Sequence, residues 1–222
     1  MNSSRSSNSN AAPTERTRVR RHPERAAYDP EVIDGILDQA WIAHVGFVSD
    51  GQPYVIPMSY VRLGRRVYFH GSAAGRTPRA LAGGISLCFT VMILDGLVLA
   101  RSHFAHSMNY RSVVVLGGAE PVDDPTEKQA ALEALIERFV PGRARETRAP
   151  SSQELKATSV LRLGLEEASA KIRSGPALDY EIDLSRACWA GVIPLALHAG
   201  APQPDPLLEA TLPPPKLSLL LR

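Results

Sequence analysis

The chain has 222 residues, 44% of them hydrophobic, and a formal net charge of +2. This length suits one sizeable hydrophobic core, and the apolar fraction is that of a folded globular protein. No segment approaches the roughly 18 to 20 consecutive apolar residues of a membrane helix, and no long basic run with interleaved aromatics indicates nucleic-acid binding. We therefore expect a cytoplasmic globular protein with no membrane and no nucleic-acid partner.

The two ends of the chain differ from its middle. Residues 1–25 are rich in Ser, Asn and Arg and almost lack large apolar side chains, so they cannot offset their ordering entropy. We expect them to form a disordered tail. Residues 26–198 carry the apolar patterning and are expected to form one domain, and the proline-rich residues 199–222 a C-terminal extension.

In chain order, the first expected element is a helix at 30–40, because Asp29 can cap it and Pro30 suits its first position. An apolar, β-branched run then ends at Ser49-Asp50-Gly51, which is typical of a hairpin turn. Pro57 lacks an N–H group and belongs at a sheet edge or bulge. The expected elements of this half are strands at 41–48, 53–63 and 66–70 and a short helix at 77–82.

The second half of the chain continues in hairpin order. Asp95-Gly96 is predicted to be a hairpin turn, and Asp124-Pro125 to begin a helix with a regular apolar face. The expected elements are strands at 85–94, 97–104 and 109–122, a helix from 125, a helical turn at 152–157, a long strand at about 160–172 and an apolar run at 188–197.

Strands joined by Asp-Gly turns predict an antiparallel sheet, and this many strands usually close into a barrel. The chain lacks both a βαβ rhythm and a GxGxxG motif after its first strand, which argues against a Rossmann domain. The predicted fold class is mainly β: an antiparallel barrel with peripheral helices.

The stretch from Gln52 to Leu81 is the most informative candidate site. Two strands lead into a helix start with Thr77 as the expected N-cap, Pro78 at the first helical position and Arg76 and Arg79 on either side. A helix N-terminus offers unpaired N–H groups and the positive end of the helix dipole. This arrangement predicts a phosphorylated ligand.

Several short motifs in order resemble the FMN-binding split-barrel family, which includes the pyridoxamine 5′-phosphate oxidases. Within that family the chain is most similar to the Nim-type nitroimidazole-resistance proteins. The resemblance covers roughly residues 28–140, with a further likeness at 188–192. The motifs are Gln52-Pro53-Tyr54, Pro57-Met58-Ser59-Tyr60, Tyr68-Phe69-His70-Gly71, Gly75-Arg76-Thr77, Asn109-Tyr110-Arg111-Ser112-Val113 and Cys188-Trp189-Ala190-Gly191-Val192.

The resemblance implies a split β-barrel homodimer that holds FMN in a groove between two barrels. Arg76 and Thr77 would bind the phosphate, Ser59 would hydrogen-bond the ring or ribityl chain, and Trp189 would cap the flavin. The full set of expected cofactor-binding residues is Pro57, Met58, Ser59, Tyr60, Phe69, His70, Gly71, Arg76, Thr77, Arg111, Ser112 and Trp189.

His70 is the expected catalytic residue, because the resemblance places it near the reactive part of the flavin as a proton donor. A structural hydrogen bond at a strand end is the other interpretation. Arg111 equally suits a cross-strand ion pair, and Trp189 equally suits core packing. His103 and His106 lack an accompanying Cys or carboxylate, so no metal site is predicted there.

The predicted function is a flavin-dependent oxidoreductase that takes electrons from NAD(P)H and passes them to a small acceptor. The basic cluster that pyridoxamine phosphate oxidases use for their substrate's phosphate is not found, which argues against vitamin B6 oxidation. Two alternatives stay open. One is a non-catalytic flavin-binding storage or sensor protein, and the other is a binder of haem or deazaflavin in the same groove, with His70, His103 or His106 as candidate haem ligands.

Overall fold

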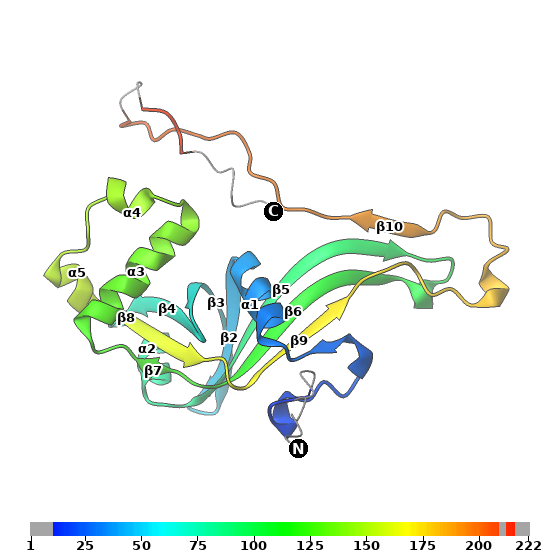
Figure 1. The fold of residues 1–222 in the computed structure, drawn as a ribbon, viewed down its shortest axis with the longest axis horizontal. Coiled ribbons are helices and arrows are strands. Elements are labelled where there is room, and N and C mark those ends of the chain that lie inside the picture. Colours follow the sequence, from blue (N-terminus) through cyan, green and yellow to red (C-terminus); the bar gives the residue numbers. More distant parts are fainter. Residues whose placement is uncertain (1–10, 209–211, 216–222) are drawn as a thin grey trace, which may run out of the picture.

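In a computed structural model, residues 11–208 and 212–215 are described. Their ten strands form one antiparallel sheet in the order β1-β9-β6-β5-β2-β3-β4-β8-β7, with β10 paired to β5 (Figure 1). The strands are β1 (Ala26–Ala27), β2 (Ile42–Ser49), β3 (Gln52–Leu63), β4 (Arg66–Ser72), β5 (Ser86–Leu99), β6 (Ser107–Gly118), β7 (Glu120–Pro121), β8 (Thr158–Gly164), β9 (Ala168–Arg173) and β10 (Gly191–Pro194). The helices are α1 (Pro30–Gln39), α2 (Arg76–Ala82), α3 (Pro125–Phe139), α4 (Arg143–Glu146) and α5 (Ser152–Ala157).

The sheet curls into a barrel with peripheral helices, as predicted. The turn between β8 and β9 is tied to β6 by a 2.9 Å hydrogen bond from the Leu116 N–H to the Glu167 carbonyl. Residues that alternate along the strands fill the barrel, among them Val45, Phe69 and Phe89. Helix α1 adds Ile33, Ile36 and Leu37 to this core.

A smaller apolar cluster lies on the outer face of the barrel, under α3. Tyr68 and Val160 supply it from β4 and β8, and Ala131 and Leu135 supply it from the helix. Since side chains alternate across a strand, Phe69 points into the barrel and its neighbours Tyr68 and His70 lie on the face toward α3. The two faces of β4 therefore belong to two different environments.

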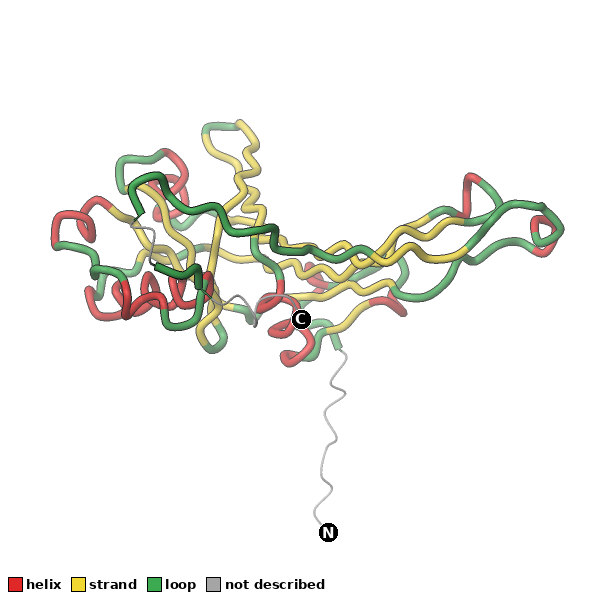
Figure 2. Tube along the Cα trace, turned by 90° about the horizontal axis from the view of Figure 1, so that it is seen from above, coloured by secondary structure: helices red, strands yellow, loops and turns green. Residues whose placement is uncertain are grey.

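Strands β5 and β6 extend well beyond the barrel as a long arm (Figures 1 and 2). The prediction of a hairpin turn at Asp95-Gly96 is wrong, because both residues lie inside β5, where a bulge separates Leu94 from Gly96. Strand β10 pairs with this part of β5, and a Cβ on Gly96 would come within 3.0 Å of the Ile193 carbonyl oxygen. Gly96 thus serves close strand approach instead of a turn.

Two further expectations differ from the structure. The predicted strand at 160–172 is two strands, because residues 165–167 turn the chain from β8 to β9. The predicted tail 1–25 is partly ordered: residues 1–10 lie outside the described residues, but Thr17 is buried and Lys171 donates a 2.9 Å hydrogen bond to the Arg21 carbonyl.

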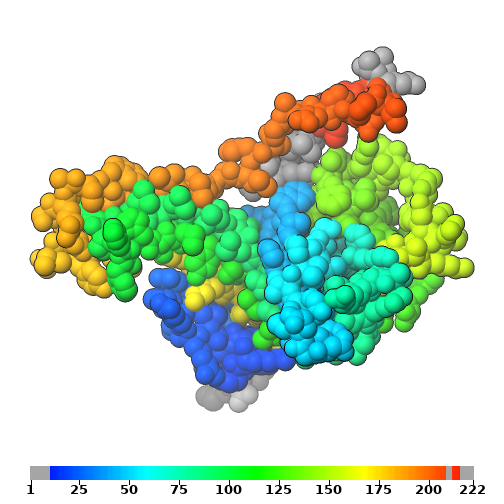
Figure 3. All heavy atoms as spheres, turned by 180° about the vertical axis from the view of Figure 1, so that it is seen from behind, coloured from blue at the N-terminus to red at the C-terminus, as the bar shows by residue number. Residues whose placement is uncertain are grey.

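The composition of this segment predicted that the entropy cost of ordering it could not be offset. Side-chain and backbone hydrogen bonds offset that cost in residues 11–25. Figure 3 shows residues 11–25 (dark blue) against the body of the molecule, and the segment after β10 leaving the arm toward the side that carries α3 and α4 (Figure 1). The predicted C-terminal extension is described only to Leu208 and over residues 212–215.

Candidate functional site

The barrel is split along one edge of β3. Strand β3 pairs with β2 from Gln52 to Ser59, but it pairs with β4 only from Tyr60 to Leu63. The segment containing Pro57, Met58 and Ser59 therefore has no strand partner on its β4 side among the described residues. This confirms the expected edge position of Pro57. Proline has no backbone N–H group, so it cannot donate a hydrogen bond to a neighbouring strand.

Helix α2 lies at the end of β4 and carries Arg76 toward β3. Gly75 is its N-cap, so the expected N-cap role of Thr77 is wrong, and Pro78 sits in the first turn, where a missing N–H costs nothing. Arg76 donates a 3.1 Å hydrogen bond from Nη1 to the Tyr54 hydroxyl, and its guanidinium carbon lies 5.5 Å from the Tyr54 ring centroid. Gly71 allows close contact with α2, since a Cβ there would lie 2.8 Å from Pro78 Cγ.

Arg76 and Arg79 form no ion pair with a carboxylate in the described part of the chain. Arg79 donates from Nε to the Ala73 carbonyl at 3.3 Å. By contrast, Arg62 and Arg111 are neutralised by aspartates. The α2 arginines are therefore available to an anionic ligand.

The side chain of His70 lines a cavity of about 850 Å³ under α3. That volume lies within the roughly 300–1,000 Å³ typical of cofactor sites. The imidazole Nδ1 is buried without a hydrogen-bond partner among the described residues. Burial also lowers the pKa of His70, which favours the neutral imidazole.

The cavity wall is largely apolar and comes from α3, α4, α5 and the segments beside them. Leu132, Leu135, Ile136, Phe139, Val140, Ala144, Ala149 and Pro150 form the apolar part, and Gln129, Glu133, Arg143, Thr147, Arg148, Glu154 and Thr158 the polar part. Both arginines are already paired: Arg143 with Glu146 and Arg148 with Glu154, each at 2.8 Å. The cavity combines a buried histidine, a large apolar surface and arginines that already have carboxylate partners.

Polar contacts fix the first turn of α3 over the cavity. The Tyr68 hydroxyl donates to Glu127 Oε1 at 2.8 Å, and Arg162 donates from Nη1 to both oxygens of the same carboxylate, at 2.8 and 3.0 Å. These hydrogen bonds hold the pKa of Glu127 below its ordinary value. The N-terminal end of the helix is thus bound to β4 and β8.

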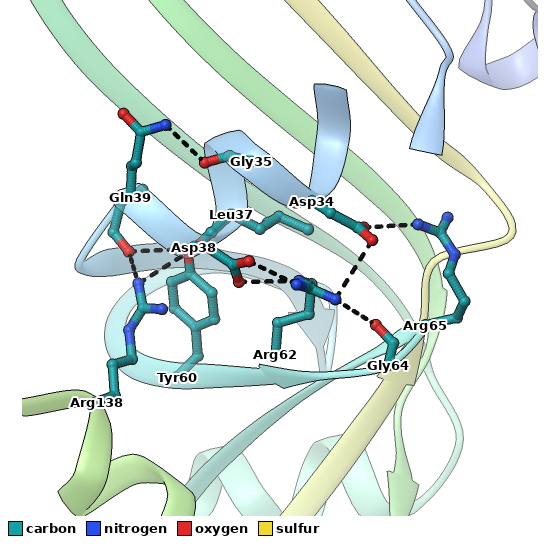
Figure 4. A network of polar contacts seen from close by, with 11 residues as sticks. Asp34, Gly35, Leu37, Asp38, Gln39, Tyr60, Arg62, Gly64, Arg65 and Arg138 are labelled. Atoms are coloured by element: carbon teal, nitrogen blue, oxygen red, sulfur yellow. Dashed lines mark hydrogen bonds and ion pairs between the residues drawn. The ribbon is translucent and has the colours of Figure 1, made fainter. Parts of the chain in front are cut away.

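At the other end of α3, Arg138 reaches the C-terminal end of α1 (Figure 4). It donates to the carbonyl oxygens of Leu37, at 3.2 Å, and Ala40. The Tyr60 hydroxyl donates to the same two oxygens, at 2.5 and 3.0 Å, and burial raises the pKa of Tyr60. Because both ends of α3 are held, the cavity beneath it is preformed.

Several of the expected cofactor-binding residues do not face the split edge. The side chains of Tyr60 and Phe69 are 0% and 1% exposed in the barrel core, so neither reaches the surface of this chain. Arg111 forms a bidentate ion pair with Asp95 at 2.7 and 2.9 Å, and Ser112 donates to the Lys171 carbonyl at 3.2 Å. Both side chains therefore make cross-strand contacts. For Arg111 this is the ion pair that the sequence offered as the alternative to cofactor binding.

Trp189 is 64% exposed and packs its ring over Gly191, beside β10. It is therefore neither in the core of this chain nor next to Arg76 within it. Met58 and Ser59 are half-buried on the split edge, and Pro57 there is exposed. At this edge lie Pro57, Met58 and Ser59 of β3, and Arg76 of α2 contacts Tyr54 of the same strand.

The cavity under α3 was not predicted. The sequence did predict α3 with an apolar face of Leu132, Leu135, Ile136 and Phe139, and such a face signals burial without saying against what. Arg143–Glu146 and Ser152–Ala157, which fold back beside α3, are polar enough to be taken for loops and turns. Within the described residues, no helix has the length and apolar character to cross a membrane, and no group of three or more His, Cys, Asp or Glu side chains could hold a metal ion.

Comparisons with known proteins agree with this architecture. The family model described as pyridoxamine 5′-phosphate oxidase matches residues 29–172. Among proteins with curated descriptions, none matches the chain.

Solved structures give closer matches. The flavocytochrome Anf3 from Azotobacter vinelandii is 42% identical, covers 95% of this chain and 98% of its own, and superposes with a TM-score of 0.88. The FAD and heme binding protein from Mycobacterium smegmatis is 37% identical, covers 86% and 94% of the two chains, and gives a TM-score of 0.82.

A protein from Bacteroides thetaiotaomicron assigned to 5-nitroimidazole antibiotic resistance shares the fold, at 24% identity, 66% and 86% coverage and a TM-score of 0.56. With the split antiparallel barrel and the match over residues 29–172, these comparisons settle the family: the chain belongs to the pyridoxamine 5′-phosphate oxidase family of split barrels.

Proposed function

We propose that this chain is a flavin-dependent oxidoreductase that also holds a haem, and that it carries electrons from a reduced nicotinamide to a small acceptor. The observation that carries the proposal is its likeness to a flavocytochrome, at 42% identity over 95% of the chain. A second relative, at 37% identity, is named for binding both FAD and haem. We therefore propose that the chain binds haem in addition to the flavin, and not as an alternative to it.

The split edge suits the flavin nucleotide. Arg76 and Arg79 have no carboxylate partner among the described residues, and Arg76 retains N–H groups beyond the one bound to Tyr54. A guanidinium can bind a phosphate through two parallel hydrogen bonds. Exposed Pro57 and half-buried Met58 and Ser59 offer an unpaired strand edge to a flat ring. When bound, the flavin supplies hydride and single-electron chemistry, and the protein sets its position and access.

FMN is the nucleotide predicted from the family resemblance, and FAD is the one in the name of the Mycobacterium relative. The resemblance also implies a homodimer and a cytoplasmic location. Chromatography of the flavin released from the purified protein distinguishes FMN from FAD.

Anaerobic reduction tests the activity. A purified protein with flavin and haem absorption should be bleached by NADH or NADPH, should show reduced haem bands, and should reoxidise when a quinone or nitroaromatic is added. Cofactors that resist reduction would favour the storage or sensor alternative, and a protein that takes up neither FMN nor FAD would contradict the proposal.

The phosphate assignment has its own test. Arg76→Ala with Thr77→Ala should weaken flavin binding by about 10- to 100-fold, which corresponds to about 1.5–3 kcal/mol for hydrogen bonds to a charged group. Arg21→Ala, which removes an exposed cation elsewhere, is the matched control. Unchanged affinity in the double variant would refute the assignment.

A further inference from the structure

The geometry points to the cavity under α3 as the haem site, with His70 as a ligand of the iron, separate from the flavin at the split edge. This inference rests on the proposed function, because it assigns a place to the haem proposed above. His70 stands on β4 and pairs with Val160 of β8 on one edge, whereas the pairing of β4 with β3 ends at Phe69, the residue before it. A ligand on a strand so held keeps a fixed position.

The state of the His70 ring matches a metal ligand. Its Nδ1 is buried with no partner among the described residues, and an unpaired buried polar atom costs free energy unless something binds it. Imidazole nitrogen is a ligand that suits iron. Haem iron would therefore provide the partner that the surrounding described residues do not give to the His70 ring nitrogen.

The cavity matches the rest of the group. A haem has a large, flat, apolar ring, and eight of the side chains that line the cavity are apolar. Its two carboxylates need polar or cationic groups at an edge, and Arg143 and Arg148 lie there, on α4 and the loop after it. Their present partners, Glu146 and Glu154, are exposed, so these ion pairs are the weak surface kind that can be exchanged.

The two candidate sites also differ in charge. A flavin nucleotide brings phosphate, which needs cations that are not already neutralised, and Arg76 and Arg79 meet that need. The cavity arginines are both paired in the described structure. The charges therefore favour phosphate at α2 and the apolar macrocycle under α3.

Of the histidines considered as haem ligands, only His70 lines this cavity. His103 and His106 lie at the far end of the arm, in the short helical turn His103–Ala105 and just after it. His106 Nδ1 is 2.7 Å from the Ser102 carbonyl, so it already has a partner. These two histidines therefore provide matched controls.

The test uses the full chain loaded with haem and compares visible spectra of His70→Ala, His103→Ala and His106→Ala. We expect His70→Ala to lose haem, with affinity lower by at least about tenfold, or to show shifted haem bands. Flavin content should stay unchanged, and added imidazole should restore the native bands. The other two variants should keep native spectra.

A second pair of variants tests the cavity without touching the ligand. Ala144→Trp places a large ring among the lining residues and should exclude haem, whereas Ala130→Trp, on an exposed position of α3, should not. Native haem bands in His70→Ala, loss of haem in His103→Ala or His106→Ala, or loss of flavin instead of haem in Ala144→Trp would each overturn the inference. Any of these three results would contradict the haem site but not the proposed function. A native protein that never takes up haem would instead contradict the haem binding in the proposed function.

Discussion

The Tyr60 hydroxyl illustrates how one buried group can hold two elements together. It and Arg138 satisfy the same two carbonyl oxygens at the end of α1, Leu37 and Ala40, which the helix leaves without partners. Tyr60→Phe should lower the free energy of unfolding by about 1–2 kcal/mol, since it removes a buried O–H donor that two carbonyl oxygens share but keeps the ring. Urea denaturation measures this change.

Tyr180→Phe removes an exposed hydroxyl from the tip of the arm and is the matched control for Tyr60→Phe. Equal stability of the two variants would show that the Tyr60 hydroxyl does not stabilise the C-terminal end of α1.

Residue roles were predictable from the sequence where they depend on near neighbours. Asp29 caps α1 as expected, accepting hydrogen bonds from the N–H groups of Glu31, at 2.8 Å, and Val32, at 3.4 Å. Tyr60 and Phe69 belong to motifs that suggested a cofactor site, but burial of both depends on strand pairing and packing over long sequence distances. A short motif cannot say which of its alternate side chains faces the ligand.

Among the elements, the arm depends on Gly96. An Asp-Gly pair between apolar runs is as typical of a hairpin as of a bulge, and only β10, from nearly a hundred residues later, distinguishes them. Gly96→Val would place side-chain atoms against the Ile193 carbonyl oxygen and Val192, which lie 3.0 and 3.1 Å from the position that a Cβ would take. We expect β10 to detach and residues 195–208 to be cleaved faster in limited proteolysis.

The matched glycine variant is Gly35→Ala, on α1, where a Cβ meets no atom within 4 Å. It should leave the cleavage rate unchanged. Equal proteolysis of Gly96→Val and the native chain would show that β10 does not need this close approach.

The attachment of α3 should depend on pH through Glu127. Its pKa is lowered from 4.5, chiefly by the hydrogen bond from Tyr68 and then by Arg162. A carboxyl with a lowered folded-state pKa stabilises the fold above its unfolded value and loses that contribution as the pH falls through the folded value. The stability difference between the native chain and Glu127→Gln should therefore be largest near neutral pH and shrink below about pH 4.5.

Denaturant titrations of the two proteins across this pH range check the prediction. Glu133→Gln, on the same helix, changes a carboxyl that makes no hydrogen bond or ion pair with the described residues, and it is the matched control. A difference that stays constant down to acidic pH would exclude Glu127 as the titrating group.

At the scale of the whole molecule, the arm is the feature that a single barrel does not explain. Large apolar side chains are exposed along it, including Phe104 (84%), Met92 and Trp189. Large apolar side chains exposed along one element favour contact with another chain. In the homodimer that the family resemblance implies, such a surface would be covered by the second copy.

Sedimentation should therefore give a mass of twice the 24.0 kDa chain. Phe104→Ser combined with Trp189→Ser should shift the protein toward monomer, because a stable interface needs about 1,200 Å² or more of buried surface and these rings are large contributors. Leu207→Ser, at an exposed position away from the arm (Figure 1), should leave the dimer intact. A native chain that sediments as a monomer with its flavin bound would show instead that one barrel with its own arm suffices to hold the cofactor.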